Sequence, residues 1–168
     1  LGIKNSDFRK AKIQFVHELV KWSGLDKLPK GSRILDVGCG IGGSSRILAK
    51  YYGFNVTGIT ISPAQVKRAR ELTPSGLSCD FQTMNALDLK FEDGSFDAVW
   101  SVEAGAHMND KNKFADEMLR TLRPGGYLAL ADWNSRDLNA YPPSFFEKLV
   151  LKQLLEQWVH PNFISIKD

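Results

Sequence analysis

The sequence predicts an α/β domain in which helices cover a doubly wound, mostly parallel β-sheet. Two observations lead to this fold class. Short apolar runs bounded by turn residues alternate with longer segments of helical periodicity, and a glycine-rich turn joins the first apolar run to a helical segment. Such alternation favours parallel strands joined by crossover helices, and we expect about five strands here.

The expected elements follow one another from the N-terminus. A leading helix spans residues 8–22, where apolar side chains recur near helical spacing and Ser23-Gly24 supplies a stop. Strands are expected at 33–37, 55–60, within 77–84, at 96–102 and at 127–133, with helices at 44–52, 63–72 and 112–122. Ser62-Pro63 caps and starts the second of these helices, and Pro124-Gly125-Gly126 ends the third.

A last helix is expected at residues 144–158, because its apolar residues occupy one broad face opposite Lys148, Lys152 and Glu156. We expect this face to dock against the domain or against further chain, with membrane or substrate contact as the alternative. The chain then divides into a helical segment at 1–30, a ligand-binding α/β core at 31–140 and a C-terminal segment at 141–168.

Composition and charge restrict the function. A hydrophobic content of 43% in 168 residues suits one globular domain with its own core. The 22 basic and 19 acidic residues are spread along the chain without a dense basic run, so nucleic acid is not an expected partner. No apolar run reaches the ~20 residues of a membrane span, and the first residues lack a signal-peptide pattern. We therefore expect a protein that is not secreted and whose Cys39 and Cys79 are free thiols.

The glycine-rich turn predicts a ligand site. Four glycines lie within the ten residues Ile34 to Gly43, where a strand turns into a helix, so backbone amides can approach a ligand that a Cβ would hold away. The spacing Gly38-x-Gly40-x-x-Gly43 also satisfies the dinucleotide pattern. The glycines alone therefore leave a nicotinamide cofactor and S-adenosylmethionine (SAM) open, as well as a tight turn without a ligand.

Two neighbouring features favour SAM. Asp36 ends the strand two residues before the first glycine, where a carboxylate can reach the ammonium group of a methionine moiety but repels a pyrophosphate. A nicotinamide cofactor also calls for an acidic residue about 20 positions after the glycines, and the sequence there reads Gly58-Ile59-Thr60-Ile61. The alternative for Asp36 is a charge partner of the helix N-terminus.

At this point the motifs resemble a known family. Asp36-Val-Gly-Cys-Gly-x-Gly-Gly and Leu122-Arg-Pro-Gly-Gly126 are similar to class I SAM-dependent methyltransferases. Val56-Thr-Gly-Ile-Thr-Ile-Ser62 with Gln65, and Ser101-Val-Glu-Ala-Gly-Ala-His-Met108, narrow the resemblance to the tocopherol C-methyltransferase group. Within it, the cyanobacterial 2-methyl-6-phytylbenzoquinol and γ-tocopherol methyltransferases are especially similar.

The resemblance implies a Rossmann-like SAM-methyltransferase sheet and covers the chain from about Phe8 to Ile166. Members of the family continue well past the equivalent of Asp168. We therefore expect a C-terminally truncated sheet, with much of the substrate wall missing.

The resemblance also implies which residues hold the cofactor. The methionine end is expected on Asp36, Gly38 and Gly40, and the ribose on Thr60, Ile61 and Gln65. Near the adenine, Asn85-Ala86 stands where the family usually has aspartate and alanine; asparagine can accept the adenine amino hydrogen bond but loses charge assistance. The full expected set is Asp36, Gly38, Cys39, Gly40, Thr60, Ile61, Gln65, Asn85, Ala86 and Ser101.

The candidate catalytic residues are His107 and Glu103, which follow the fourth strand at the carboxyl edge of the sheet. His107 can take a phenol proton as the ring attacks, with an orienting or structural histidine as the alternative. Glu103 can orient His107 or a bound hydroxyl, with a loop-fixing carboxylate as the alternative. Trp133 either walls an aromatic substrate or packs under the last helix. His17 and His160 have no metal-like companions, so no metal site is assigned.

The expected function is therefore SAM-dependent methyl transfer, with S-adenosylhomocysteine as product. The resemblance implies a ring carbon of a prenylated hydroquinol, of tocopherol or plastoquinol type, as the acceptor. An amine or sterol-like acceptor is one alternative, and a SAM-binding fragment without turnover is another. The expected partner is a lipophilic aromatic small molecule, with peripheral membrane contact and a cytoplasmic or plastid and thylakoid-associated location; the oligomeric state stays open.

Overall fold

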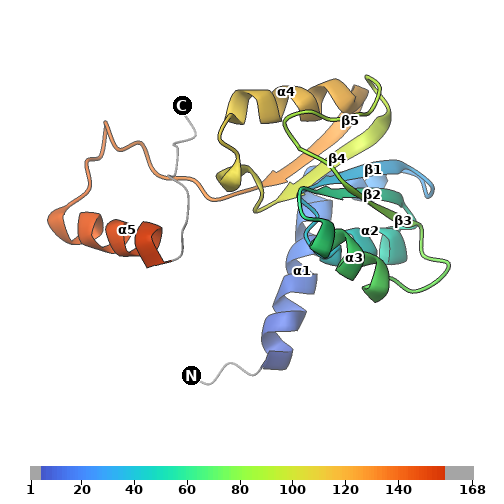
Figure 1. The fold of residues 1–168 in the computed structure, drawn as a ribbon, viewed down its shortest axis with the longest axis horizontal. Helices are drawn as coiled ribbons and strands as arrows, with labels where there is room; N and C mark the ends of the chain where they lie inside the picture. The colour runs from blue at the N-terminus through green and yellow to red at the C-terminus, as the bar shows by residue number, and fades with distance from the viewer. Residues whose placement is uncertain (1–4, 158–168) are drawn as a thin grey trace.

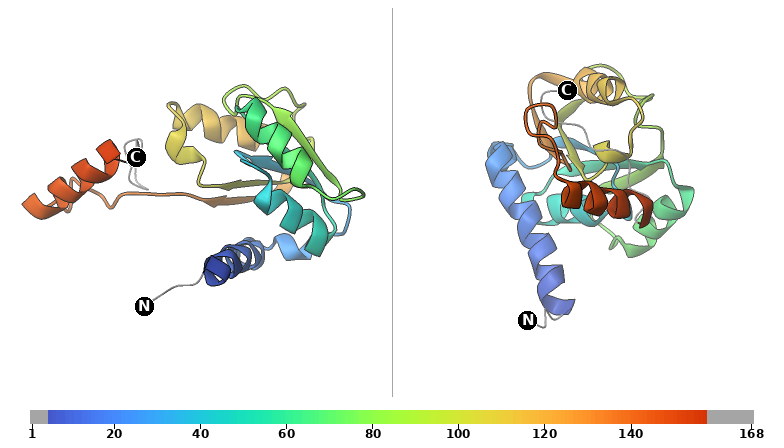
Figure 2. Two further views of the ribbon diagram at one scale, coloured as in Figure 1. Left: turned by 60° about the horizontal axis from the view of Figure 1, so that its bottom comes forward. Right: turned by 90° about the vertical axis from the view of Figure 1, so that its left-hand side faces the viewer.

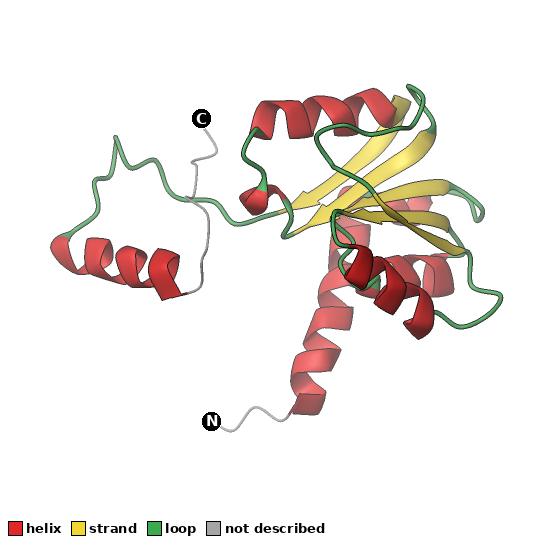
Figure 3. Cartoon of the chain, viewed as in Figure 1, coloured by secondary structure: helices red, strands yellow, loops and turns green. Residues whose placement is uncertain are grey.

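The structure is a computed structural model that describes residues 5–157. Its centre is a five-stranded sheet with the strand order β3-β2-β1-β4-β5 and parallel pairing throughout (Figures 1 and 3). The doubly wound parallel sheet expected from the sequence is confirmed. The strands are β1 (Arg33–Val37), β2 (Asn55–Thr60), β3 (Cys79–Thr83), β4 (Phe96–Val102) and β5 (Leu122–Ala131).

Helices cover both faces of the sheet (Figures 1 and 2). One face carries α1 (Asn5–Ser23), α2 (Gly43–Tyr52) and α3 (Pro63–Leu72), and the other carries α4 (Lys111–Thr121). Right-handed crossovers place α2 and α3 together because the chain steps in one direction from β1 to β3, whereas α4 follows a step in the other direction. Two short 3-10 helices, η1 (Leu25–Lys27) and η2 (Gly105–His107), complete the core.

Side-chain caps start two of these helices, and the sequence predicts the first of them. The hydroxyl of Ser62 accepts a hydrogen bond from the backbone N–H of Gln65 at 3.3 Å, and Pro63 occupies the first turn of α3. The carboxylate of Asp110 accepts from the backbone N–H of Lys113 at 2.9 Å at the start of α4. Both caps satisfy amide groups that have no partner within the helix.

Alternate residues of the strands build a core on each face of the sheet. Ile34 packs with Leu48 and Val20 on the face covered by α1 and α2. Leu35 packs with Phe114 on the face covered by α4. Since successive side chains of a strand point to opposite faces, strands buried on both sides become apolar runs rather than alternating ones.

The fifth strand differs from its expected bounds. It begins at Leu122 rather than residue 127 and ends at Ala131 rather than Trp133. Phe96 of β4 pairs with Leu122 while Ala98 pairs with Tyr127, so the strand accommodates extra residues at an irregularity in the register. The helix α4 ends at Thr121, one residue before its expected end, but the Pro-Gly-Gly segment lies within β5 rather than between helix and strand.

The last helix, α5 (Phe145–Gln157), stands apart from the sheet in Figure 1 and in the left view of Figure 2. Its expected apolar face does not pack on the described sheet, and Phe145 and Phe146 are 77% and 76% exposed. Trp158 and His160 lie outside the described residues. Among helices in the described part of the chain, none combines the length and apolar character needed to cross a membrane.

Candidate cofactor and acceptor site

The site predicted from the sequence lies at the carboxyl edge of the sheet. β1 is flanked by β2 on one side and β4 on the other, and the helices that follow β1 and β4 cover opposite faces. This is the topological switch point at which ligands of open α/β sheets bind. The glycine-rich turn follows β1 and the loop with Glu103 follows β4, so the structure brings the two candidate segments together, with Gly38 against Ala104.

Two glycines of the turn have different spatial roles. Gly38 has φ +78°, and a Cβ added there would collide with the Cβ of Ala104, so the turn is pressed against the loop after β4. Gly40 has φ +55°, and a Cβ added there would meet no atom within 4 Å. The backbone at Gly38 is therefore covered by the loop after β4, whereas the backbone at Gly40 is uncovered and leaves room for a ligand.

Asp36 is a buried carboxylate at the end of the central strand. It is 2% exposed, and the hydroxyl of Ser45 in the first turn of α2 donates to its Oδ2 at 2.5 Å. Burial raises the pKa of Asp36 to about 6, although the hydrogen bonds from Ser45 oppose that rise. The contact with the start of α2 agrees with the alternative weighed for this residue. A buried carboxylate also favours a cationic ligand, and the ammonium contact stays a prediction.

The two cysteines are free thiols, as expected. Burial raises the pKa of the Cys39 thiol well above its usual range, and the neighbouring Asp36 carboxylate adds to the rise. Burial raises the pKa of Cys79 to about 11. Since the thiolate is the reactive form, Cys39 can serve the turn only as a neutral packing group. A Cβ on Gly58 of β2 would lie 3.0 Å from Cys39 Sγ, which shows how closely the turn packs on that strand.

The end of β2 supplies the residues expected on the ribose. Thr60 is buried, and its hydroxyl donates to Oε1 of Gln65 at 2.6 Å. Ile61 is 73% exposed beside them. The hydrogen bond ties the strand end to the first turn of α3, and it presents neutral hydrogen-bonding groups where a dinucleotide site would present a carboxylate.

Three other expected cofactor residues have structural contacts of their own. The side-chain oxygen of Asn85 accepts from the backbone N–H of Leu87 at 2.9 Å, which forms an Asx turn. Ala86 is buried in the core beneath α4. The hydroxyl of Ser101 is fully buried and donates to the carbonyl of Val37 at 2.9 Å, which ties β4 to β1. Contacts of these residues with a cofactor stay predictions.

The loop after β4 carries the candidate catalytic residues. Glu103 has φ +53°, which is uncommon for a residue other than glycine, and its N–H donates to the carbonyl of Ala131 at 2.8 Å. His107 ends η2 and is exposed. The sequence analysis gave no role to two side chains that hold this loop, Asp132 and Lys111. Their positions in the sequence could have indicated this role, because Asp132 directly follows β5 and Lys111 begins α4.

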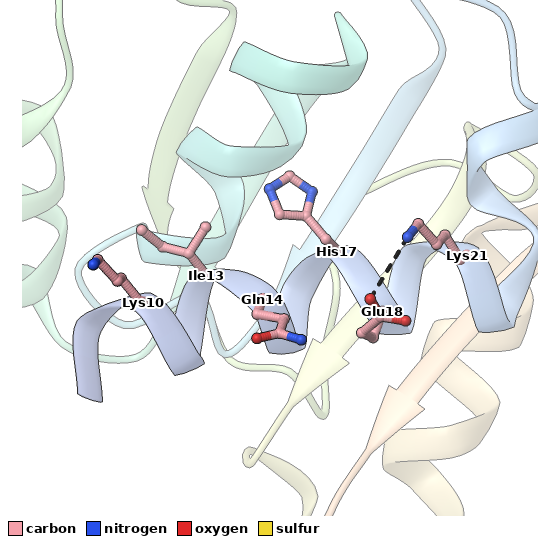
Figure 4. A pocket seen from close by; sticks show the side chains of 6 residues that line it. All are labelled: Lys10, Ile13, Gln14, His17, Glu18 and Lys21. Carbon is pink, nitrogen blue, oxygen red and sulfur yellow. Dashed lines mark ion pairs between the residues drawn. The ribbon is translucent and has the colours of Figure 1, made fainter. Parts of the chain in front are cut away.

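Two hollows lie elsewhere on the described surface. Residues of α1 alone line the first, where Lys21 pairs with Glu18 at 3.6 Å and His17 contacts the hydroxyl of Tyr52 at 2.8 Å (Figure 4). The second is a cavity of about 420 Å³ between the segment after β5 and α5, and Trp133 lines it together with Phe146. Trp133 therefore faces α5 across a cavity. Neither hollow contains residues of the glycine turn, and no cluster of three metal-ligating side chains occurs within residues 5–157.

Comparison with known proteins defines the class of this fold and site. The methyltransferase domain family matches residues 35–130, more than half of the chain. The chain therefore belongs to this family of SAM-dependent methyltransferases. A solved geranyl diphosphate methyltransferase in complex with SAM aligns with a TM-score of 0.78 at 26% identity, over 96% of this chain and 63% of that chain.

The curated relatives are more specific. The chain is 63% identical over 161 residues to the 2-methyl-6-phytyl-1,4-hydroquinone methyltransferase of Synechocystis sp., covering 96% of this chain and 51% of that protein. It is 38% identical over 174 residues to the chloroplastic tocopherol O-methyltransferase of Arabidopsis thaliana, covering 99% and 50%. The chain thus spans about half the length of these relatives. The family resemblance expected from the motifs is confirmed.

Proposed function

We propose that this protein transfers a methyl group from SAM to a ring carbon of a prenylated hydroquinol. The observation that carries the proposal is the pairing of an open backbone position at Gly40 with the buried carboxylate of Asp36 at the switch point of the sheet. The 63% identity to a phytylhydroquinone methyltransferase supports the choice of acceptor. The described residues supply the cofactor side and one wall of the acceptor side.

The residues of the crevice fit the cofactor. Asp36 would accept from the ammonium group, which relieves the cost of its buried charge, and the backbone at Gly40 would approach the methionine end. Gln65 and Thr60 would hold the ribose hydroxyls. SAM, when bound, supplies a methyl group on a positive sulfonium as the electrophile. Because the electrophile comes with the cofactor, the protein needs chiefly to position the acceptor and exclude water.

On the acceptor side, His107 takes the proton of a ring hydroxyl at one of its imidazole nitrogens. Loss of that proton raises the electron density at the neighbouring ring carbon, which is the atom to be methylated. Glu103 orients the imidazole or a second hydroxyl from the same loop. A base at this place accelerates attack without being indispensable, because the hydroquinol ring is already electron-rich.

The leading helix supports the peripheral membrane contact that a lipid-like acceptor requires. Phe8, Phe15 and Trp22 are exposed and recur at intervals of seven residues along α1. Lys10 and Lys12 lie on the same helix. Exposed aromatic residues beside basic ones are typical of helices that lie on an anionic bilayer surface. We place the protein at such a surface in a cyanobacterial or plastid setting, in line with the origin of its relatives.

The proposal is tested by measuring cofactor binding and methyl transfer on one sample. Titration calorimetry should show SAM binding, and labelled SAM should then place the methyl group on a ring carbon of a phytylated hydroquinol. The same hydroquinol without its prenyl chain, and a small amine, serve as control acceptors. Transfer to the amine alone would contradict the choice of acceptor. Absence of SAM binding would contradict the function as a whole.

A further inference from the structure

The loop that carries Glu103 and His107 is held from two sides by charged groups. Oδ2 of Asp132, directly after β5, accepts from the backbone N–H of Ala106 at 3.0 Å. Oδ1 of the same carboxylate accepts from the backbone N–H of Trp133 at 2.8 Å. The first hydrogen bond fastens one side of η2 to the end of β5, and the second orients the carboxylate.

Lys111 fastens the other side. Its ammonium group donates to the carbonyl oxygens of Gly105, Ala106 and Met108 at 2.8, 3.3 and 2.9 Å. An ammonium group has three N–H donors, so these contacts use all of them. The carbonyl of Gly105 also accepts from the N–H of Met108 at 3.0 Å, and a charged donor stabilises such carbonyls more strongly than a neutral one. Lys111 therefore acts as a cap for η2.

The backbone around η2 packs closely against its neighbours. A Cβ on Gly105 would lie 2.5 Å from Oδ2 of Asp132 and 3.2 Å from the ring of Phe114. On the opposite side, Ala104 abuts Gly38 of the cofactor turn so closely that a Cβ there would collide with it. The loop thus packs against the glycine-rich turn on one side, and against α4 and the end of β5 on the other.

We propose that Lys111 and Asp132 are positioning residues that fix the acceptor-side loop against the cofactor turn. Glu103 at φ +53° lies in a backbone conformation that persists only when its surroundings hold it. Its own N–H donates to Ala131, and the two charged contacts hold the residues that follow it. The proposal rests on the proposed function, because it assigns the acceptor side to Glu103 and His107. The two residues act through the backbone and need not touch the acceptor.

Hydrogen exchange of the full chain, followed by mass spectrometry, tests whether these contacts keep the loop ordered, and it does not depend on enzyme activity. Lys111→Met should raise exchange of the peptide covering residues 103–109 by about tenfold, because a charged hydrogen-bond set is lost. Peptides from β1 and α2 should keep their protection. Lys113→Met, on the exposed side of the same helix, is the matched control, and Lys111→Arg should restore most of the protection. Unchanged exchange in Lys111→Met, or an equal rise in every peptide, would overturn the proposal.

Steady-state kinetics with a phytylated hydroquinol then separates positioning from loss of folded protein. Lys111→Met and Asp132→Asn should raise the acceptor KM and lower kcat, together reducing kcat/KM about 10- to 100-fold, while the KM for SAM stays near its native value. Loss of folded enzyme alone lowers kcat without changing either KM, and that result would contradict the proposal. If the native protein methylates no hydroquinol, the proposed function fails, whereas the exchange experiment still decides on the hold.

Discussion

The charge of the buried Asp36 carboxylate affects both the stability of the free protein and the proposed binding of a cationic cofactor. The residue is buried, and its pKa is raised to about 6. A group whose pKa is raised on folding contributes stability at low pH and loses it as the pH rises through the folded value. At neutral pH the ionised carboxylate therefore destabilises the unliganded fold, and a cationic ligand would remove that cost. The charge of Asp36 thus lowers the stability of the free protein, and the proposed cofactor contact would restore it.

The Asp36→Asn variant should separate these two effects. With a pKa about two units above the ordinary value, we expect the free energy of unfolding at pH 7.5 to rise by on the order of 3 kcal/mol, with almost no gain near pH 3. Urea unfolding at both pH values measures the change. Asp116→Asn, at an exposed position on α4, is the control. A gain of equal size at both pH values would show that burial of the charge is not the cause.

Cofactor affinity should depend on pH through the same carboxylate. Below pH 6 a proton must leave Asp36 before the ammonium group can bind, so we expect the Kd for SAM to rise by up to about tenfold per pH unit. Titration calorimetry between pH 5 and pH 8 measures how the Kd depends on pH. The Asp36→Asn variant should bind SAM weakly, with a Kd that does not change with pH. Native affinity in that variant would remove Asp36 from the cofactor site.

Two glycines of the turn should respond differently to alanine. Gly38→Ala meets Ala104 as well as an unfavourable φ, so we expect a stability loss of about 3 kcal/mol or more together with the loss of SAM binding. Gly40→Ala has free space and should lose only about 1 kcal/mol, yet lose SAM affinity because its Cβ enters the ligand's place. Thermal unfolding and calorimetry of both variants check this contrast. Native SAM affinity in Gly40→Ala would mean that the cofactor does not approach this backbone.

At the scale of elements, helix α1 has one buried apolar face and one exposed aromatic face. Val16 and Val20 are buried against the sheet and α2, whereas Phe8, Phe15 and Trp22 face solvent. The apolar periodicity of the sequence predicted the helix correctly. It did not distinguish the two apolar faces, because both have helical spacing and only the position of the sheet decides which one is covered.

The exposed face of α1 should bind anionic vesicles. Replacing Phe15 and Trp22 by serine should weaken binding by about tenfold or more, because each aromatic ring buries apolar area at the bilayer surface. Sedimentation with vesicles of phosphatidylglycerol and phosphatidylcholine measures the change, and added salt should also weaken binding. Leu119→Ser, which removes an exposed apolar residue of α4, is the control. Equal binding by the aromatic variant and the native chain would show that this face does not touch lipid.

At the scale of the whole molecule, β5 is an edge strand of the described sheet and carries exposed apolar side chains. Leu128 and Leu130 are 36% and 44% exposed, and alternation along the strand puts them on the face that carries α4. Open strand edges with apolar residues favour pairing with another chain. We expect this chain to self-associate and Leu130→Lys to reduce the association, as measured by analytical ultracentrifugation. Leu119→Lys should have no effect, and a strictly monomeric native chain would contradict the expectation.

Much of the fold could be predicted because its signals are local. The bounds of β1, β2 and β4 match the apolar runs, and Ser62 and Pro63 start α3 where expected. The fifth strand was misplaced because its Pro-Gly-Gly segment reads as a terminator, whereas the partner strand tolerates the extra residues at a register irregularity. A turn signal reports the local backbone and carries no information on what a neighbouring strand accommodates.

The sequence by itself determined the class of fold, the glycine turn and the edge of the sheet where the site lies. Spacing of apolar residues, helix caps and glycines acts over a few residues and can be read along the chain. Only the tertiary structure decided that Ala104 closes on Gly38, that Ser101 ties β4 to β1, and that Lys111 caps the loop of His107. Such contacts depend on how the elements pack in three dimensions. The hydroxyl of Ser101, for example, meets a carbonyl 64 residues away in the sequence.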